Sequence, residues 1–135
     1  MKNGMNPELG LAILRVVLGV IFIAHGWPKL GSMAGTAEFL SGLGVPASVV
    51  AAWALTALEL GGGILLLVGF LVTPVALLLT AHMLAGIVLV HAANGFYVLG
   101  PGAGGIEFNL LLAAAAMMLV FGGPGLAALD SRNHP

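Results

Sequence analysis

The chain alternates four long apolar segments with short stretches rich in glycine, proline and polar residues. Within each segment the apolar residues are continuous rather than alternating, which is typical of membrane helices and not of the strands of a membrane barrel. A helix rises about 1.5 Å per residue and a bilayer core is about 30 Å thick, so segments of this length can cross it. The sequence predicts spans at residues 7–27, 46–70, 74–93 and 106–121.

The stretches between the spans carry signals that stop and start helices. Asn6 and Pro7 are a typical N-cap and first helical residue, and Pro28 with Gly31 is expected to break the first span. Residues 32–45 are too short and too mixed to cross, so they are predicted to form a brief amphipathic turn at the membrane interface. Residues 94–105 are predicted to form a glycine-rich loop.

The composition indicates the fold class. Hydrophobic residues make up 60% of the 135 residues and charged residues only 7%, with a mean hydropathy of +1.13. A soluble domain needs far more charge to cover its surface. We therefore expect an all-α integral membrane protein: a single domain over residues 1–135 that forms a four-helix transmembrane bundle. With four crossings both termini lie on one side, predicted to be the cytoplasmic side of the inner (plasma) membrane.

The charge balance and the lack of cysteine narrow the chemistry. The net charge is −1 and no lysine or arginine cluster occurs, which argues against nucleic acid as a partner and against a polybasic lipid-binding patch. Membrane lipid is expected as a partner because of the apolar spans. Without cysteine the chain has no thiolate nucleophile, disulfide or iron–sulfur ligand of its own. We expect no intrinsic cofactor, so any redox chemistry would use a substrate or a partner.

Two charged residues are predicted to lie inside the membrane. Charges at the centre of a bilayer cost about 2.5–3.5 kcal/mol on insertion scales, so each needs a partner or a function. Arg15 in the first span and Glu59 in the second are expected to form an ion pair in the bundle core. Such a pair could fix the helix register, or it could carry protons or a substrate.

A second polar group is predicted near the opposite, noncytoplasmic face. His25 and His91 follow Pro7 and Pro74 by 18 and 17 residues in spans that run in the same direction, so their depths should agree within about 2 Å. The polar residues expected to ring a shallow pocket there are His25, Lys29, His91, Asn94, Glu107 and Asn109. His82 is half a helical turn out of phase with His91, so it is predicted to face elsewhere, at a helix contact or a subunit interface.

Three uses fit such a pocket. A quinone headgroup matches best, because its carbonyl oxygens need donors such as histidine and lysine and a carboxylate can relay protons. Two histidines with a carboxylate also resemble a metal or haem site, but no local signature such as H-E-x-x-H accompanies them, so no metal ligands are assigned. The third reading is a hydrogen-bonded network that only ties helix ends together.

With these residues in place, the sequence resembles the DoxX family of small four-span membrane proteins over nearly its whole length. The first motif is "LRVVLGVIFIAHGWPKL", whose matching residues are Arg15, Gly19, His25, Gly26 and Lys29. The second is "ELGGGILLLVGFLVTPVALLL", matched through Glu59, Gly62 and Gly63. The third and fourth are "HMLAGIVLVHAANGFY" and "GGIEFNLLL" with the closing "GGPGLAALD", which include Met83, Ala85, His91, Asn94, Gly95, Phe96, Gly105, Glu107, Asn109, Gly123, Pro124, Gly125 and Asp130.

The resemblance implies a function in respiratory or thiol redox chemistry, because the family includes subunits of quinol oxidase and thiosulfate:quinone oxidoreductase type. We expect the chain to be a membrane subunit or anchor of an oxidoreductase complex of this kind that contacts quinone, with protein partners or further copies of itself. Two alternatives stay open: a small transporter or channel that uses the Arg15–Glu59 pair, and a purely structural accessory subunit.

Overall fold

The computed structural model describes residue 4 and residues 6–132, and these residues form helices and loops without a strand. The helices are α1 (Pro7–Leu30), α2 (Met33–Gly42), α3 (Ser48–Val68), α4 (Val72–Gly86) and α5 (Glu107–Gly122). After α4 the chain continues through a π-helical turn, η1 (Ile87–His91), and a 3-10 turn, η2 (Ala92–Asn94). A last 3-10 turn, η3 (Asp130–Arg132), closes the described part. The predicted all-α class is confirmed.

Three helical segments of the described chain are long and apolar enough to cross a membrane: Pro7–Leu30, Ser48–Val68 and Val72–Asn94. The fourth, α5, is also apolar but has only 16 residues. Each boundary lies within three residues of the span boundary predicted from sequence. The helices therefore form a membrane bundle, with three long members and one shorter one.

Two local predictions at the first turn need correction. Pro28 does not end α1, which continues to Leu30 and stops at Gly31, whose N–H donates to the Pro28 carbonyl over 3.2 Å. A proline in the last turn of a helix loses only one backbone hydrogen bond, and the helix tolerates it there. Residues 32–45 contain more than a brief turn, because Met33–Gly42 is a ten-residue helix that buries Ala37 and Leu40.

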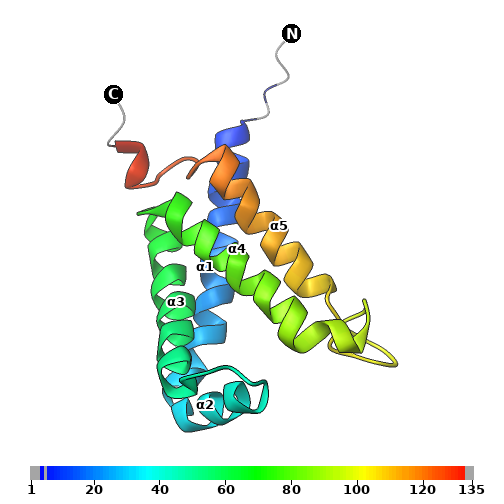
Figure 1. The fold of residues 1–135 in the computed structure, drawn as a ribbon. Helices are drawn as coiled ribbons and strands as arrows, with labels where there is room; N and C mark the ends of the chain where they lie inside the picture. The colour runs from blue at the N-terminus through cyan, green and yellow to red at the C-terminus, as the bar shows by residue number, and fades with distance from the viewer. Residues whose placement is uncertain (1–3, 5, 133–135) are drawn as a thin grey trace.

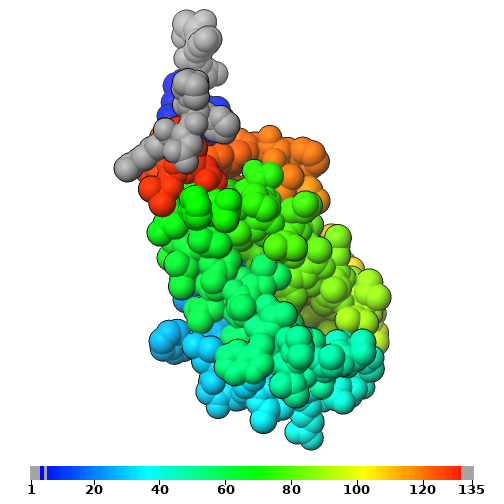
Figure 2. Space-filling view, turned by 60° about the vertical axis from the view of Figure 1, so that its left-hand side comes forward, coloured from blue at the N-terminus to red at the C-terminus, as the bar shows by residue number. Residues whose placement is uncertain are grey.

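The helices are arranged as two pairs. α1 packs along α3 and α4 packs along α5, whereas contacts between the pairs are fewer. Figure 1 shows that the pairs meet at the end where α1 begins and η3 lies, and that they diverge toward α2 and the loop after η2. Figure 2 shows α2, in cyan, covering the end of the molecule opposite the red η3. The divergence leaves a wedge between the pairs, above α2.

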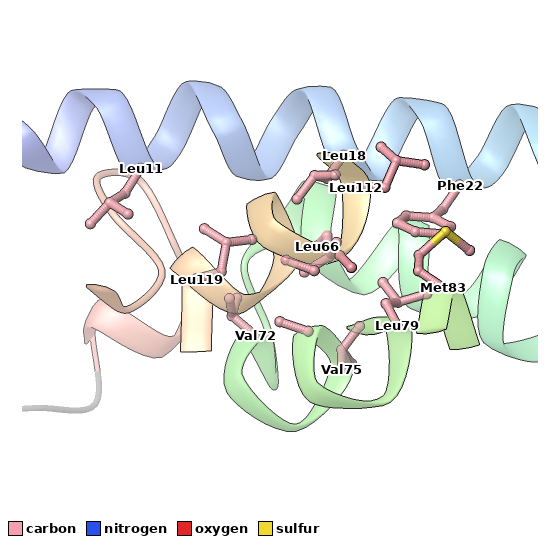
Figure 3. Close-up of a cluster of buried hydrophobic side chains, with 13 residues drawn as sticks. Leu11, Leu18, Phe22, Leu66, Val72, Val75, Leu79, Met83, Leu112 and Leu119 are labelled. Carbon is pink, nitrogen blue, oxygen red and sulfur yellow. The ribbon is translucent and has the colours of Figure 1, made fainter. Parts of the chain in front are cut away.

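The core lies where α1, α3, α4 and α5 converge. Leu18, Phe22, Leu66, Leu79 and Leu119 are almost fully buried there, and Figure 3 shows their side chains meeting between the helices. Close approach of α1 to α3 requires glycine on both sides. A Cβ atom on Gly19 would lie 2.8 Å from the Gly63 carbonyl oxygen, and one on Gly63 would lie 2.8 Å from that of Gly19. This contact fixes the antiparallel register of the two helices.

Candidate ligand site

A buried carboxylate, Glu59, is the centre of the site. Its side chain is only 6% exposed, and each of its two oxygens contacts a basic side chain. Lys29 Nζ lies 2.5 Å from Oε2, and His82 Nε2 lies 3.0 Å from Oε1. The cluster therefore joins α1, α3 and α4 through one anion.

The packing of α1 on α3 explains how Lys29 reaches Glu59. A Cβ atom on Gly26 would lie 2.7 Å from the Leu60 backbone nitrogen, so only glycine permits this approach. Lys29 is three residues further along α1 and therefore on nearly the same face. Its Nζ also donates to the His25 carbonyl over 2.9 Å, which holds the ammonium above Glu59.

The predicted Arg15–Glu59 ion pair is wrong. The register of α1 against α3 places Gly26 beside Glu59, so Arg15 lies 11 residues, or about 16 Å, further along α1. Arg15 is 2% exposed and donates only to backbone carbonyls among the described residues. Its acceptors are Leu66 at 2.7 Å, Pro124 at 2.8 Å, Leu67 and Leu126 at 3.0 Å, and Ala127 at 3.4 Å.

These acceptors have a common cause. Leu66 and Leu67 belong to the last turn of α3, where carbonyls lack the usual i+4 partner, although that of Leu66 also accepts from the N–H of the capping Gly69. The segment 124–127 returns over this helix end and presents further carbonyls to the same guanidinium. Arg15 thus closes the end of α3 and fastens the returning chain. We call Arg15 with residues 124–127 the terminal latch.

The prediction that His82 faces elsewhere is also wrong. That prediction assumed 3.6 residues per turn from His82 to His91. Ile87–His91 instead forms a π-helical turn, with wider i→i+5 hydrogen bonding. The wider turn changes the phase between the two histidines. His91 therefore shares a cavity with His82, which contacts Glu59 from α4.

A cavity of about 460 Å³ occupies the wedge between the helix pairs, with α2 as its floor. Twelve of its 19 lining residues are apolar. The polar ones are His25, Lys29, Thr36, Glu59, His82, His91 and Asn109. Four of the six residues predicted for the polar pocket therefore do line one cavity, and Glu59 and His82 join them.

The other two predicted pocket residues, Asn94 and Glu107, do not line this cavity. Glu107 accepts a hydrogen bond from the Val98 backbone N–H over 2.7 Å, and Asn94 Nδ2 donates to the Gly104 carbonyl over 3.4 Å. His91 Nδ1 donates to the same carbonyl over 2.6 Å. These bonds hold the loop after η2 in place, so that part of the prediction describes a structural network.

Glu107 therefore does not share a pocket with His25 and His91 as predicted, because its carboxylate is turned to the loop. Over residues 6–132, no three histidine, aspartate or glutamate side chains lie close enough together to hold a metal ion. Asn109 is 9% exposed, and its Nδ2 donates to the Met83 carbonyl over 3.4 Å, which ties α5 to α4 at the cavity wall.

The cavity mouth is apolar on the side between α2, η1 and α5, whereas the exposed His25 of α1 also lines the cavity. Phe39 of α2, Leu89 of η1 and Phe108 of α5 all line the cavity, yet they are 54%, 48% and 38% exposed. The cavity therefore reaches the surface between α2, η1 and α5. In a membrane protein this rim faces the hydrocarbon or the interface, so an apolar chain could pass through it.

Comparison with known proteins finds relatives that are similar to this chain over most of its length. The family model described as DoxX matches residues 10–92, which include Lys29, Glu59 and His82. "Putative oxidoreductase CatD" of Bacillus subtilis is 32% identical over 91% of this chain and 86% of its own length. The inner membrane proteins YphA and YqjF of Escherichia coli are 32% and 30% identical, over 90% and 91% of this chain and 89% and 91% of theirs. No solved structure matches the chain.

Proposed function

The chain belongs to the DoxX family of membrane proteins, and from this premise we propose that it is a membrane subunit of an oxidoreductase assembly whose cavity binds a quinone-type ligand. The observation that carries the proposal is the cavity of about 460 Å³ with the Lys29–Glu59–His82 cluster in its wall. Cavities of about 300–1,000 Å³ with apolar walls and a few convergent polar groups are typical of small-molecule sites.

The polar groups suit the oxygen atoms of a quinone. Lys29 Nζ has three N–H donors, of which two go to the His25 carbonyl and to Glu59. The third is available to a ligand carbonyl in the cavity. His82 and His91 add imidazole nitrogens to the same wall, and imidazole can donate or accept a proton near neutral pH.

The apolar mouth suits the rest of such a ligand. Quinones of membranes carry long hydrocarbon tails, and the rim of Phe39, Leu89 and Phe108 offers an apolar exit from the cavity. A headgroup held at Lys29 could therefore keep its tail in lipid while it is bound. A water-soluble ligand would gain nothing from such a rim.

The relatives support the oxidoreductase part of the proposal, since one of them carries the name "Putative oxidoreductase CatD". Reduction of a quinone takes up two electrons and two protons, and oxidation of a quinol releases them. The chain has no cysteine. In the proposed assembly a redox centre of a partner subunit exchanges the electrons, and this chain binds the ligand and handles protons.

The transporter alternative depended on an Arg15–Glu59 pair, and the structure holds these residues apart in two separate networks. The structural accessory subunit is the outcome that remains if the cavity binds no ligand. A binding experiment separates that outcome from the proposal.

The test fills the cavity without touching the charged cluster. Ala85 and Ala81, one turn apart on α4, are both exposed, but only Ala85 lines the cavity. In detergent, the protein should bind decylubiquinone, measured by calorimetric titration. Ala85→Phe should weaken binding by about tenfold or more, or about 1.4 kcal/mol, because the ring occupies ligand space. Ala81→Phe should bind like the unaltered protein. No binding by the unaltered protein, or equal binding by both variants, would refute the proposal.

A further inference from the structure

We propose that His82, with Glu59 behind it, accepts the hydroxyl proton of a bound quinol, so that the ligand enters this site in its reduced form. The inference rests on the proposed function and deepens it by naming the substrate class and the proton acceptor. It follows from how the two oxygens of Glu59 are used and from what is left free on the imidazole ring.

The hydrogen bonds determine which ring nitrogen carries the proton. An ionised carboxylate only accepts hydrogen bonds, and Glu59 lies 2.5 Å from the Lys29 ammonium. The contact of 3.0 Å between His82 Nε2 and Glu59 Oε1 is therefore an Nε2–H donor on a carboxylate. In the neutral ring Nδ1 is then an acceptor, and His82 lines the cavity.

This arrangement is the carboxylate–imidazole pair of general base catalysis. The carboxylate fixes the tautomer and orientation of the ring, and it stabilises the imidazolium that forms when Nδ1 takes a proton. The Glu59 side chain is 6% exposed and that of His82 18%, so little water screens the pair. His82 can therefore take up a proton without leaving an isolated charge in the membrane.

The proposed step is a single proton transfer. The O–H bond of the quinol breaks, and an N–H bond forms at Nδ1 of His82. The negative oxygen of the resulting quinol anion faces the Lys29 ammonium, which lines the same cavity. No electron moves in this step. Later oxidation of this anion to quinone sends two electrons to the redox centre proposed for a partner subunit and releases the second hydroxyl proton to water. The anion gives up electrons more readily than the neutral quinol does.

The surrounding groups favour His82 over the other imidazoles. In the described part of the chain, His82 is the only histidine paired with a carboxylate. His91 uses Nδ1 on the Gly104 carbonyl, and the His25 ring lies 6.2 Å from Phe108. The groups that face the cavity from each element are Lys29 and His25 from α1, Thr36 from α2, Glu59 from α3, His91 from η1 and Asn109 from α5.

The test uses a chromophoric probe, a nitrophenol that carries a ten-carbon chain, because its absorption band separates phenol from phenolate. At about one pH unit below the pKa of the probe, roughly a tenth of it is phenolate in water. Bound to the purified protein, more than about half should be phenolate, because His82 takes the proton. The bound phenolate fraction therefore rises about fivefold.

The decisive variant is His82→Gln. The glutamine amide nitrogen can replace the Nε2–H donor to Glu59, but it has no basic lone pair. Whatever the affinity of this variant, the probe that it binds should return to mostly phenol. His25→Gln removes an imidazole from the same cavity without touching Glu59, and whatever its affinity, the probe that it binds should stay phenolate. An unchanged phenolate band in His82→Gln would overturn the proposal.

A measurement on the unaltered protein covers the case in which His82→Gln does not fold. With ¹⁵N-labelled histidine, the His82 ring should show a protonated Nε2 and a bare Nδ1 without ligand, and two protonated nitrogens with bound probe. A ring that stays neutral with the probe bound would overturn the proton acceptor while decylubiquinone binding still supports the site. If neither decylubiquinone nor the probe binds, both the site and the proton acceptor are refuted.

Discussion

The two ends of the bundle bury charge in opposite ways. At one end Arg15, 2% exposed, donates to backbone carbonyls of α3 and of residues 124–127. At the other end Glu59 is bound by two side chains, Lys29 and His82, beside a cavity of about 460 Å³. Burying an ionisable group in a membrane costs free energy, so the contacts at each end must offset that cost.

The difference lies in what the partners can do. Backbone carbonyls neither titrate nor change rotamer, so the terminal latch has one arrangement and serves stability. Lysine and histidine side chains can move, and histidine can change its protonation state. The Glu59 cluster can therefore respond to a ligand, whereas the latch cannot. If this comparison is right, changes at the two ends should separate stability from binding.

The largest effect on stability is expected from Arg15→Leu. It removes the donor to the carbonyls of Leu67, Pro124, Leu126 and Ala127 in an apolar environment, and it removes one of two donors to the carbonyl of Leu66, which keeps the Gly69 N–H. Unfolding free energy should fall by about 3–5 kcal/mol, since hydrogen bonds to a charged group contribute about 1.5–3 kcal/mol each and are not additive. Denaturation in detergent followed by circular dichroism measures this.

Arg15→Lys is the matched control for that prediction. It keeps the charge but replaces the planar five-donor fork by three donors on one atom, so its loss should be intermediate. Both variants, where folded, should bind decylubiquinone with unchanged affinity. A loss below about 1 kcal/mol for Arg15→Leu would show that the latch contributes no more than an ordinary surface contact.

The second prediction concerns the glycine contact that holds Lys29 over Glu59. In Gly26→Ala the new Cβ atom would lie 2.7 Å from the Leu60 nitrogen, so α1 must move away from α3. We expect a loss of about 1–3 kcal/mol in unfolding free energy, together with weaker decylubiquinone binding, because the Lys29–Glu59 contact lengthens. Thermal unfolding and calorimetric titration measure the two effects.

Gly61→Ala provides a control with the opposite sign. Nothing lies within 4 Å of a Cβ atom at Gly61, so alanine there should raise helix stability by about 0.5–1 kcal/mol and leave binding unchanged. If both variants behaved alike, close helix approach at Gly26 would not be what positions the cluster.

The fold could be predicted from sequence because its signals are local. Continuous apolar runs, Asn6 as N-cap and the glycines after each run determine the helix boundaries to within three residues. The partners of Arg15 and Glu59 could not be predicted in this way, because they depend on the register of α1 against α3. Gly19, Gly26 and Gly63 carry that information, but only as a pattern of close contacts between two helices.

Most of the polar residues that line the cavity could be predicted from sequence, but the Glu59–His82 contact at its centre could not. Lys29, His25, His91 and Asn109 were expected together and line one cavity. His82 was missed because nothing in the residues 87–91 signals a π-helical turn, and a count at 3.6 residues per turn turns its ring away from the cavity. Glu107 was misplaced because the backbone N–H of Val98 competes for its carboxylate, and loop geometry is not encoded in helical spacing.

The smallest effect is expected at Asp130, which extends the terminal latch to α4. Its Oδ1 and Oδ2 accept hydrogen bonds from the backbone N–H groups of Leu71 and Val72, over 3.0 and 2.8 Å, where α4 begins. Those groups have no helical acceptor, so Asp130→Ala should cost about 1 kcal/mol of unfolding free energy, as for other lost N-caps, and Asp130→Asn, which keeps one oxygen, less.

Asp130→Ala should leave decylubiquinone binding unchanged. Leu71 and Val72 lie at the N-terminal end of α4, and the first residue of α4 that lines the cavity is His82. Ten residues of helix, or about 15 Å, separate Val72 from His82. Equilibrium unfolding and calorimetric titration on the same preparation give both values. A binding loss of about tenfold from this change would mean that the latch sets the geometry of the Glu59 cluster through α4, and the separation of the two ends into a stabilising part and a responsive part would then be wrong.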